Sequence, residues 1–187
     1  MRKSNVTRMI LCAMFAAITA VLSQIVIPIG PVPINLATFA VFCAGALLGP
    51  KFGALSMTVW AALGAVGVPV FTMLRGGLGV LAGPTGGYII GYIPAAFLIG
   101  LIVDKVNNNK MFIYPIAMTA GALAYFILGT AWFMASTNTE LIQSLMICVI
   151  PFIPGEALKV AAATILAHRL RPVVNIRIAQ SPKTKEI

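Results

Sequence analysis

The stretch MFIYPIAMTAGALAYFILGTAWFMASTNT, which runs from Met111 to Thr139, contains no charged residue. Roughly 20 apolar residues suffice to cross a bilayer as a helix, so this stretch is long enough for one crossing. Three more charge-free runs cover Met9–Pro50, Phe52–Leu74 and Gly76–Val103. Of the 187 residues, 60% are hydrophobic and 9% are charged, and the mean hydropathy is +1.00, values that no ordinary soluble domain approaches. The sequence therefore predicts an all-α integral membrane protein.

Breaks within these runs set the number of crossings. Pro28, Gly30, Pro31 and Pro33 interrupt the longest run, and because proline lacks an amide donor we expect a turn there. We predict a compact bundle of six transmembrane helices in a single membrane domain, 1–187, with a basic tail at 171–187. The expected helices cover about 6–27, 35–48, 52–66, 84–103, 111–135, and a last one from either 141 or 154 to 170.

The distribution of positive charge predicts the topology, because cytoplasmic loops carry an excess of lysine and arginine. With the N-terminus inside, 11 of the 13 Lys and Arg residues fall on the cytoplasmic side. Arg75 alone falls outside, and Lys159 lies within a helix. We therefore expect both termini in the cytoplasm of a multi-pass cell-membrane protein. The formal net charge of +9 is then a property of inner loops and of a tail near anionic lipid, and nucleic-acid binding is not expected.

The inventory of chemical groups argues against an enzyme. The sequence has no phosphate-binding loop, no H-E-x-x-H pair and no serine nucleophile elbow. Glu156 is the one acid expected inside the membrane, so neither a pair of catalytic carboxylates nor a proton relay can be assembled easily. Cys12, Cys43 and Cys148 are scattered without C-x-x-C spacing, which indicates free thiols and no metal site. No cofactor is expected.

Glu156 and Lys159 stand three residues apart in an apolar segment and form the first candidate site. A charge in hydrocarbon costs at least ~2.5–3.5 kcal/mol and persists mainly where it is paired, wetted or bound to a polar ligand. A helix that begins near Pro154 places Glu156 in its first turn, where free amides stabilise a carboxylate. The pair is a substrate-site candidate, with a purely structural salt bridge between helices as the alternative.

The second candidate site is the glycine-rich connection from Arg75 to Tyr88, which we expect on the outer side. Glycines such as Gly86 and Gly87 allow the backbone to approach a ligand closely, and Thr85 and Tyr88 supply hydroxyl groups. The alternative is that these glycines only allow neighbouring helices to pack closely. Packing alone would leave Arg75, the one outer cation, without a role.

Two further positions have alternative interpretations. Asn35 follows the turn Pro31-Val32-Pro33 and is either an amide donor and acceptor for a ligand or the N-cap of the next helix. Ala13 and Ala17 form a small-x-x-x-small face on the first helix. That face either packs internally or docks a second membrane subunit, which a binding protein without its own energy source would need.

Four motifs together resemble the BioY family: Pro31-Val32-Pro33, Ala44–Ser56, Gly79–Tyr88 and Pro154-Gly155-Glu156-x-x-Lys159. The resemblance implies a six-helix, biotin-binding substrate component of an energy-coupling-factor (ECF) transporter. Such a component works with a transmembrane coupling subunit and two cytoplasmic ATPase subunits, and topples in the membrane to release biotin. It also implies that the Ala13–Ala17 face contacts the coupling subunit, and that the pocket uses the loop before the fourth helix and the start of the sixth.

The sequence departs from the family pattern at three positions. Threonine and glutamine are usual where this chain has Asn35 and Ala37, and aspartate is usual in place of Glu156. Alanine cannot form a side-chain hydrogen bond, so the polar role of position 37 is lost or passes to Asn35.

Biotin matches this set of groups chemically. Its ureido ring has two N–H donors and a carbonyl, for which Glu156 and Asn35 would be acceptor and donor. Its carboxylate needs a cation, and our hypothesis assigns Lys159 to the carboxylate and Arg75 to gating or steering. The alternatives are another small carboxylated vitamin or a self-sufficient small secondary transporter, although the latter lacks a second buried acid and an inverted repeat.

Overall fold

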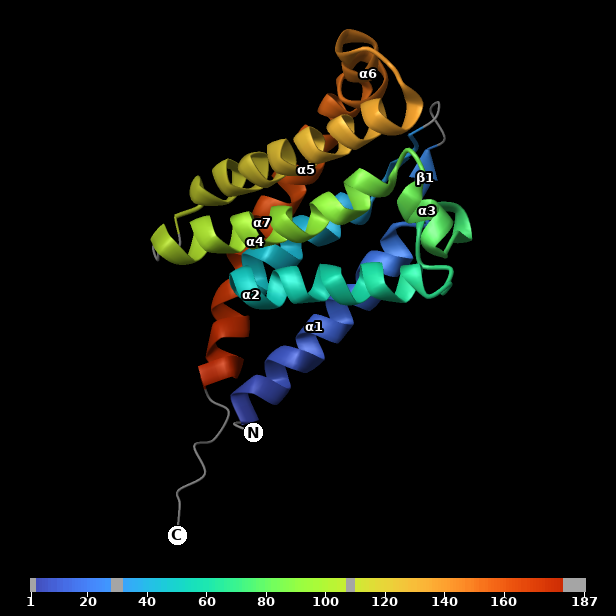
Figure 1. Cartoon of the computed structure of the whole chain (residues 1–187). Helices are drawn as coiled ribbons and strands as arrows, with labels where there is room; N and C mark the ends of the chain where they lie inside the picture. The colour runs from blue at the N-terminus through green and yellow to red at the C-terminus, as the bar shows by residue number, and fades with distance from the viewer. Residues whose placement is uncertain (1–2, 28–31, 107–109, 180–187) are drawn as a thin grey trace.

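The computed structural model describes residues 3–27, 32–106 and 110–179. The expected turn at Pro28, Gly30 and Pro31 and the end of the basic tail, 180–187, lie outside the described residues. The structure is almost entirely helical (Figure 1). Its helices are α1 (Lys3–Leu22), α2 (Ala37–Ala65), α3 (Leu78–Ala82), α4 (Gly86–Val106), α5 (Ile113–Thr137), α6 (Leu141–Cys148) and α7 (Ile153–Ala179), with 3-10 turns η1 (Thr72–Leu74) and η2 (Ile150–Phe152). The predicted all-α class is confirmed.

Several of these helices are long and apolar enough to cross a membrane. Within the described ranges four segments qualify, namely α2, α4, α5 and the stretch Leu141–Val174 that contains α6 and most of α7. The apolar part of α1, Val6–Leu22, is shorter. These spans agree with a multi-pass membrane protein. The number of crossings depends on whether α2 is one helix or two.

Helix α2 is bent back on itself at Gly49. The backbone there has φ 77° and ψ −178°, a conformation open to glycine, and Pro50 follows as the first residue of the second arm. A Cβ atom on Gly53 would lie 3.0 Å from the Cα of Gly45, whereas residues eight apart in a straight helix are separated by ~12 Å. The two arms, 37–48 and 50–65, therefore pack face to face.

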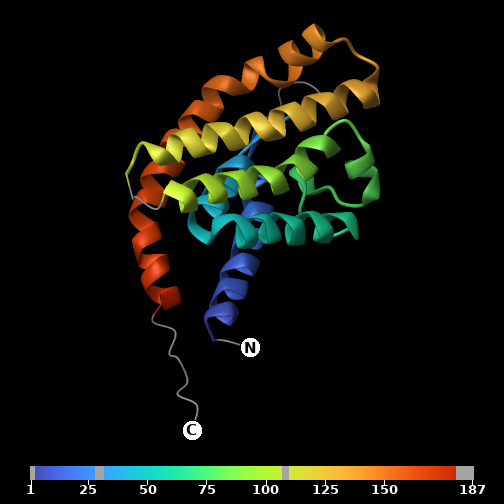
Figure 2. The same cartoon turned by 60° about the vertical axis from the view of Figure 1, so that its left-hand side comes forward.

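Small residues set the spacing between α2, α4 and α5, which lie side by side (Figure 2). A Cβ on Gly45 would stand 2.7 Å from the carbonyl oxygen of Ala96 in α4. One on Gly91 would stand 3.0 Å from the Cα of Tyr125 in α5. Helices without side chains at these points can approach closely, as is common within membranes. Helix α7 crosses these helices. Its first turn lies beside the start of α2, where Glu156 contacts Thr38.

The ends of the elements differ from the sequence prediction. The first helix ends at Leu22, and Val26–Ile27 forms strand β1, which pairs antiparallel with β2 (Ile34–Asn35). The fourth helix begins at Gly86 because α3 occupies part of the preceding connection. The last span has a break at η2, where Pro151 offers no amide for a continuous helix. Helix α7 then continues to Ala179, so the first part of the expected tail is helical.

Candidate functional site

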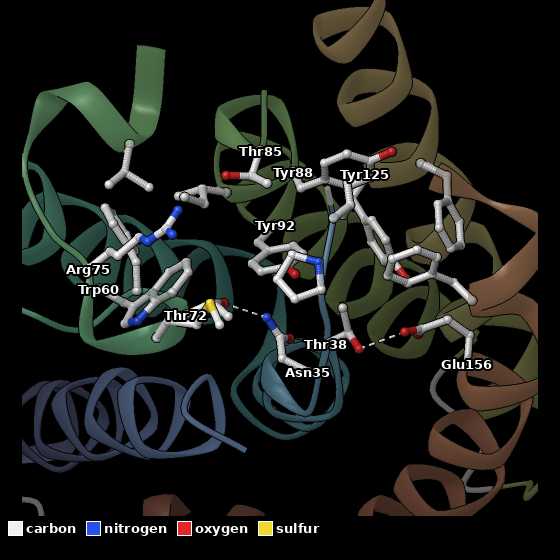
Figure 3. A pocket seen from close by; sticks show the side chains of 18 of the residues that line it. Asn35, Thr38, Trp60, Thr72, Arg75, Thr85, Tyr88, Tyr92, Tyr125 and Glu156 are labelled. Atoms are coloured by element: carbon white, nitrogen blue, oxygen red, sulfur yellow. Dashed lines mark hydrogen bonds between the residues drawn. The ribbon is translucent and has the colours of Figure 1, made fainter. Parts of the chain in front are cut away.

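A cavity of about 400 Å³ lies among α2, α4, α5, the first turn of α7 and the segment before α3. Figure 3 shows Glu156 and Arg75 on opposite sides of this cavity, with aromatic side chains between them. Six of the predicted site residues line it: Asn35, Arg75, Thr85, Tyr88, Glu156 and Lys159. These residues come from four separate stretches of the sequence, so the fold gathers them at one place.

A buried polar cluster of Thr38, Glu156 and Lys159 forms one wall. The ammonium group of Lys159 donates to Oε1 of Glu156 at 2.6 Å and to the Thr38 hydroxyl at 2.9 Å. The Thr38 hydroxyl in turn donates to the same Oε1 at 2.9 Å (Figure 3). All three residues are buried, with exposed fractions of 4%, 6% and 7%. The charges are thus neutralised by each other and held by a hydroxyl from a different helix.

The second carboxylate oxygen of Glu156 is the unsatisfied part of this cluster. Oε2 is buried and has no hydrogen-bond partner among the described residues. Buried polar atoms in native proteins nearly always have a partner, and an exception marks a ligand contact or a strained site. The Tyr125 hydroxyl, which lines the same cavity, is also buried without a partner in the described part of the chain and interacts electrostatically with Glu156. Glu156 therefore presents an acceptor within the cavity wall that either a ligand or Tyr125 can use.

The two cations at the cavity differ in availability. Lys159 already uses two of its three N–H donors inside the cluster. Arg75 is exposed, lines the same cavity, and makes no salt bridge to any described acidic residue. The geometry therefore leaves Arg75 as the cation that is free to meet an anionic group.

Asn35 lines the cavity and braces the start of α2, although the N-cap residue of that helix is Leu36. Its side-chain oxygen accepts a hydrogen bond of 3.0 Å from the amide of Ala37, the first residue of α2, and its Nδ2 donates to Thr72 at 2.7 Å. It thus holds the start of α2 and ties it to the opposite wall, while one amide proton remains. Ala37 itself is fully buried and is not part of the cavity lining.

Gly86 and Gly87 do not line the cavity, unlike Thr85 and Tyr88 beside them. A Cβ on Gly86 would collide with the carbonyl of Leu81, and one on Gly87 with the side chain of Trp132. The structure thus supports the packing interpretation for these two glycines. Tyr88 lines the cavity with its hydroxyl 3.2 Å from that of Thr130.

The aromatic walls and Thr38 are features that sequence reasoning missed as site residues. Trp60 and Tyr92 are stacked with ring centroids 5.8 Å apart, and Tyr125 meets Tyr92 edge to face at 5.5 Å. Aromatic residues occur throughout apolar runs, so no pattern singled these out. Thr38 left a fainter signal, because it is the only hydroxyl residue in the predicted helix 35–48.

Outside the cavity, Ala13 and Ala17 are exposed on α1, whereas the adjacent Ala16 is 3% exposed and packs inside. The three cysteines are buried and unpaired. Within the described ranges, no group of three His, Cys, Asp or Glu residues is arranged to hold a metal.

Comparison with known proteins identifies the family to which this chain belongs. The sequence matches the model of the BioY family over residues 1–176. The chain belongs to the BioY family. It is 39% identical to the probable biotin transporter BioY of Pyrococcus horikoshii over 161 residues, which covers 86% of this chain and 94% of that protein. It is 35% identical to the biotin transporter BioY of Thermotoga maritima over 164 residues, or 88% and 95% of the two chains.

A solved structure of the S-component for biotin from an ECF-type ABC transporter has the same fold. It superposes on this BioY-family chain with a TM-score of 0.86 and 32% sequence identity, and the match covers 92% of this chain and 94% of the other. The family predicted from the four sequence motifs is confirmed.

Proposed function

We propose that this chain captures biotin at the outer face of the cell membrane, as the substrate-binding subunit of an ATP-driven ECF transporter. The observation that carries the proposal is the cavity itself, which combines a buried free carboxylate oxygen, aromatic walls and an exposed arginine on the opposite side. Biotin has complementary parts in the same order: a ureido ring with N–H donors, apolar fused rings with an aliphatic chain, and a carboxylate.

The ureido ring binds at the buried cluster. Oε2 of Glu156 accepts from a ureido N–H, and the remaining proton of Lys159 donates to the ureido carbonyl. Asn35 has one amide proton left for the same ring. Trp60 and Tyr92 give the fused rings apolar surfaces, since aromatic side chains bury large areas at little entropic cost.

The biotin carboxylate binds Arg75, which reverses the assignment made from sequence. Lys159 is neutralised by Glu156 and has little charge to offer a second carboxylate. The guanidinium of Arg75 is free of acidic partners among the described residues and suits a bidentate contact with a carboxylate. Thr85 and Tyr88 also line the pocket, with Tyr88 beside Tyr125 (Figure 3).

The membrane arrangement that we propose has six crossings, with both termini in the cytoplasm. The crossings are α1, the two arms of α2, α4, α5, and α6 together with α7. Eleven of the 13 Lys and Arg residues then face the cytoplasm, which supports this orientation. An impermeant thiol reagent should label a cysteine at Gly79 in intact cells but not one at Lys51; the reverse pattern would contradict the orientation.

The transporter partners in this proposal are a transmembrane coupling subunit and two cytoplasmic ATPase subunits. The sequence itself carries no nucleotide-binding motif, so the energy must come from other chains. The exposed pair Ala13 and Ala17 on α1 is the contact for the coupling subunit, because small residues let a partner helix approach closely.

Titration calorimetry of biotin with the detergent-purified chain tests the function. We expect tight binding that Glu156→Gln weakens by about 10–100-fold, the value of a hydrogen bond to a charged group. Glu140→Gln, which changes an exposed acid remote from the cavity, is the matched control and should bind as the wild type does.

Two other results would contradict the proposed function. No binding of biotin by the folded wild type would overturn the proposal, and other small carboxylated vitamins would then be titrated. Uptake that persists in cells without any ATPase subunit would favour a self-sufficient transporter instead.

A further inference from the structure

The segment Phe71–Arg75 forms the wall of the cavity that carries Arg75. It is a closed turn, because the amide of Phe71 donates to the carbonyl of Arg75 at 3.0 Å. Met73 and Leu74 inside it have φ values of 62° and 55°, in the left-handed region that residues with a Cβ rarely adopt. Two consecutive residues in this conformation persist only where the surroundings hold them in place.

The beginning of the turn is anchored by packing. The ring of Phe71 is 1% exposed, fits against Gly64 and meets Trp60 edge to face at 5.2 Å. Trp60 also donates from its indole nitrogen to the carbonyl of Val70 at 3.1 Å. The side chain of Leu74, the residue next to Arg75, is 69% exposed, so packing does not fix this end.

Gln24 holds the end of the turn that packing leaves free. Its side-chain oxygen accepts a hydrogen bond of 2.8 Å from the amide of Leu74, and its nitrogen donates to the carbonyl of Phe71 at 3.0 Å. One side chain thus binds both limbs of the turn. The same nitrogen lies 3.1 Å from the carbonyl of Ala20, which fixes Gln24 to the last turn of α1.

Gln24 does not line the cavity, so its effect on a ligand is indirect, and Phe71–Arg75 is the part of the cavity wall that its side chain contacts. We propose that Gln24 is a positioning residue: its side-chain amide holds Phe71–Arg75 so that the Arg75 guanidinium meets the carboxylate of the bound ligand. This inference rests on the proposed function, since it concerns the anionic end of the same pocket. It adds a role for the turn that follows α1 in selecting carboxylated over neutral ligands.

The test compares biotin with biotin methyl ester, which has no carboxylate, as ligands of Gln24→Met. Methionine matches glutamine in length but forms none of these hydrogen bonds. We expect affinity for biotin to fall about tenfold, the loss of roughly one hydrogen bond to a charged group, and affinity for the ester to stay the same. Gln143→Met, at an exposed glutamine of α6, is the matched control and should change neither affinity.

A second comparison isolates the route through Arg75. In an Arg75→Ala background, Gln24→Met should have no further effect on biotin affinity, because the group that Gln24 positions is gone. Hydrogen exchange of the peptide that contains the Leu74 amide should also be faster in Gln24→Met than in the wild type.

Two results would overturn the inference: an equal loss of affinity for biotin and its ester, or unchanged affinity for biotin. If Gln24→Met does not fold, Gln24→Glu keeps the acceptor for the Leu74 amide and carries the same comparison between the two ligands. A wild type that binds no biotin would instead remove the proposed function, and this inference with it.

Discussion

At the scale of single residues, the Thr38–Glu156–Lys159 cluster is too costly to be explained as a stabilising ion pair. Removing two charges from water usually costs more free energy than their attraction returns, and a pair of apolar residues is often more stable. Here Oε2 of Glu156 also remains without a partner in the described structure. A cluster that adds little net stability and leaves one acceptor open is better explained by ligand binding.

The cluster predicts that a single variant is less stable than the double variant that contains it. Lys159→Met leaves the Glu156 carboxylate buried without a counter-ion and should lower the free energy of unfolding by about 3–5 kcal/mol. The double variant Lys159→Met with Glu156→Gln removes both charges and should recover most of that loss, yet bind no biotin. Thermal unfolding in detergent measures both effects, with Lys110→Met, an exposed lysine, as the control. A single variant as stable as the double variant would contradict this account.

The sequence predicted the charged residues that line the cavity, together with Asn35, Thr85 and Tyr88, but it did not predict Thr38 or the separate roles of the two cations. Glu156, Lys159 and Arg75 stood out because each is a rare charge in an apolar chain. That Lys159 is occupied and Arg75 free depends on which atoms come within about 3 Å of each other, which no spacing rule supplies. The aromatic walls, such as Trp60 and Tyr92, resemble any other apolar residues until the fold brings them together.

At the scale of elements, the turn at Gly49 determines whether α2 is one helix or two. Its positive φ disfavours any residue with a Cβ. A Cβ at this position would also lie 2.8 Å from Oδ2 of Asp104. Asp104 is half exposed, and its other oxygen is bound by Arg171 at 2.6 Å. Its side chain would have to shift within this surface ion pair, and the main cost of a Cβ is the positive φ. The turn of α2 thus lies against the C-terminal end of α4, which an ion pair links to α7.

Gly49→Ala should therefore lower the free energy of unfolding by at least about 1–2 kcal/mol, the cost of a left-handed residue with a Cβ. Gly79→Ala is the matched control, since a Cβ there would meet no atom within 4 Å and the backbone is not left-handed. Melting temperatures of the two purified variants give the comparison. Equal melting temperatures would show that the turn tolerates a side chain.

The apolar runs predicted the presence of the helices better than their ends. Charge-free stretches of bilayer length permit few alternatives to helix, because every backbone group must be paired within the chain. The ends depend on local pairings with a weaker sequence signal, such as Val26–Ile27 with Ile34–Asn35 or the 3-10 turn at Ile150–Phe152. The break at η2 nonetheless matters for function, because it starts α7 where Glu156 falls in the first turn.

At the scale of the whole molecule, the ligand pocket and the surface proposed for docking are separate. Ala13 and Ala17 lie on the exposed side of α1, and neither lines the cavity. Helix α1 is therefore free to contact a second membrane subunit while the pocket remains occupied. Its buried side, which includes Cys12 and Ala16, holds it to the rest of the bundle.

Larger side chains on the exposed face of α1 should therefore abolish biotin uptake and leave biotin binding unchanged. We expect the double variant Ala13→Leu with Ala17→Leu to bind biotin in detergent as the wild type does. It should fail to copurify with the coupling subunit and to support uptake, because two leucines prevent the close approach that alanine allows. Ala162→Leu, at an exposed alanine of α7, adds similar bulk elsewhere and should leave uptake intact. Loss of biotin binding in the double variant would show that this face of α1 maintains the fold, and unchanged uptake would place the coupling contact on another helix.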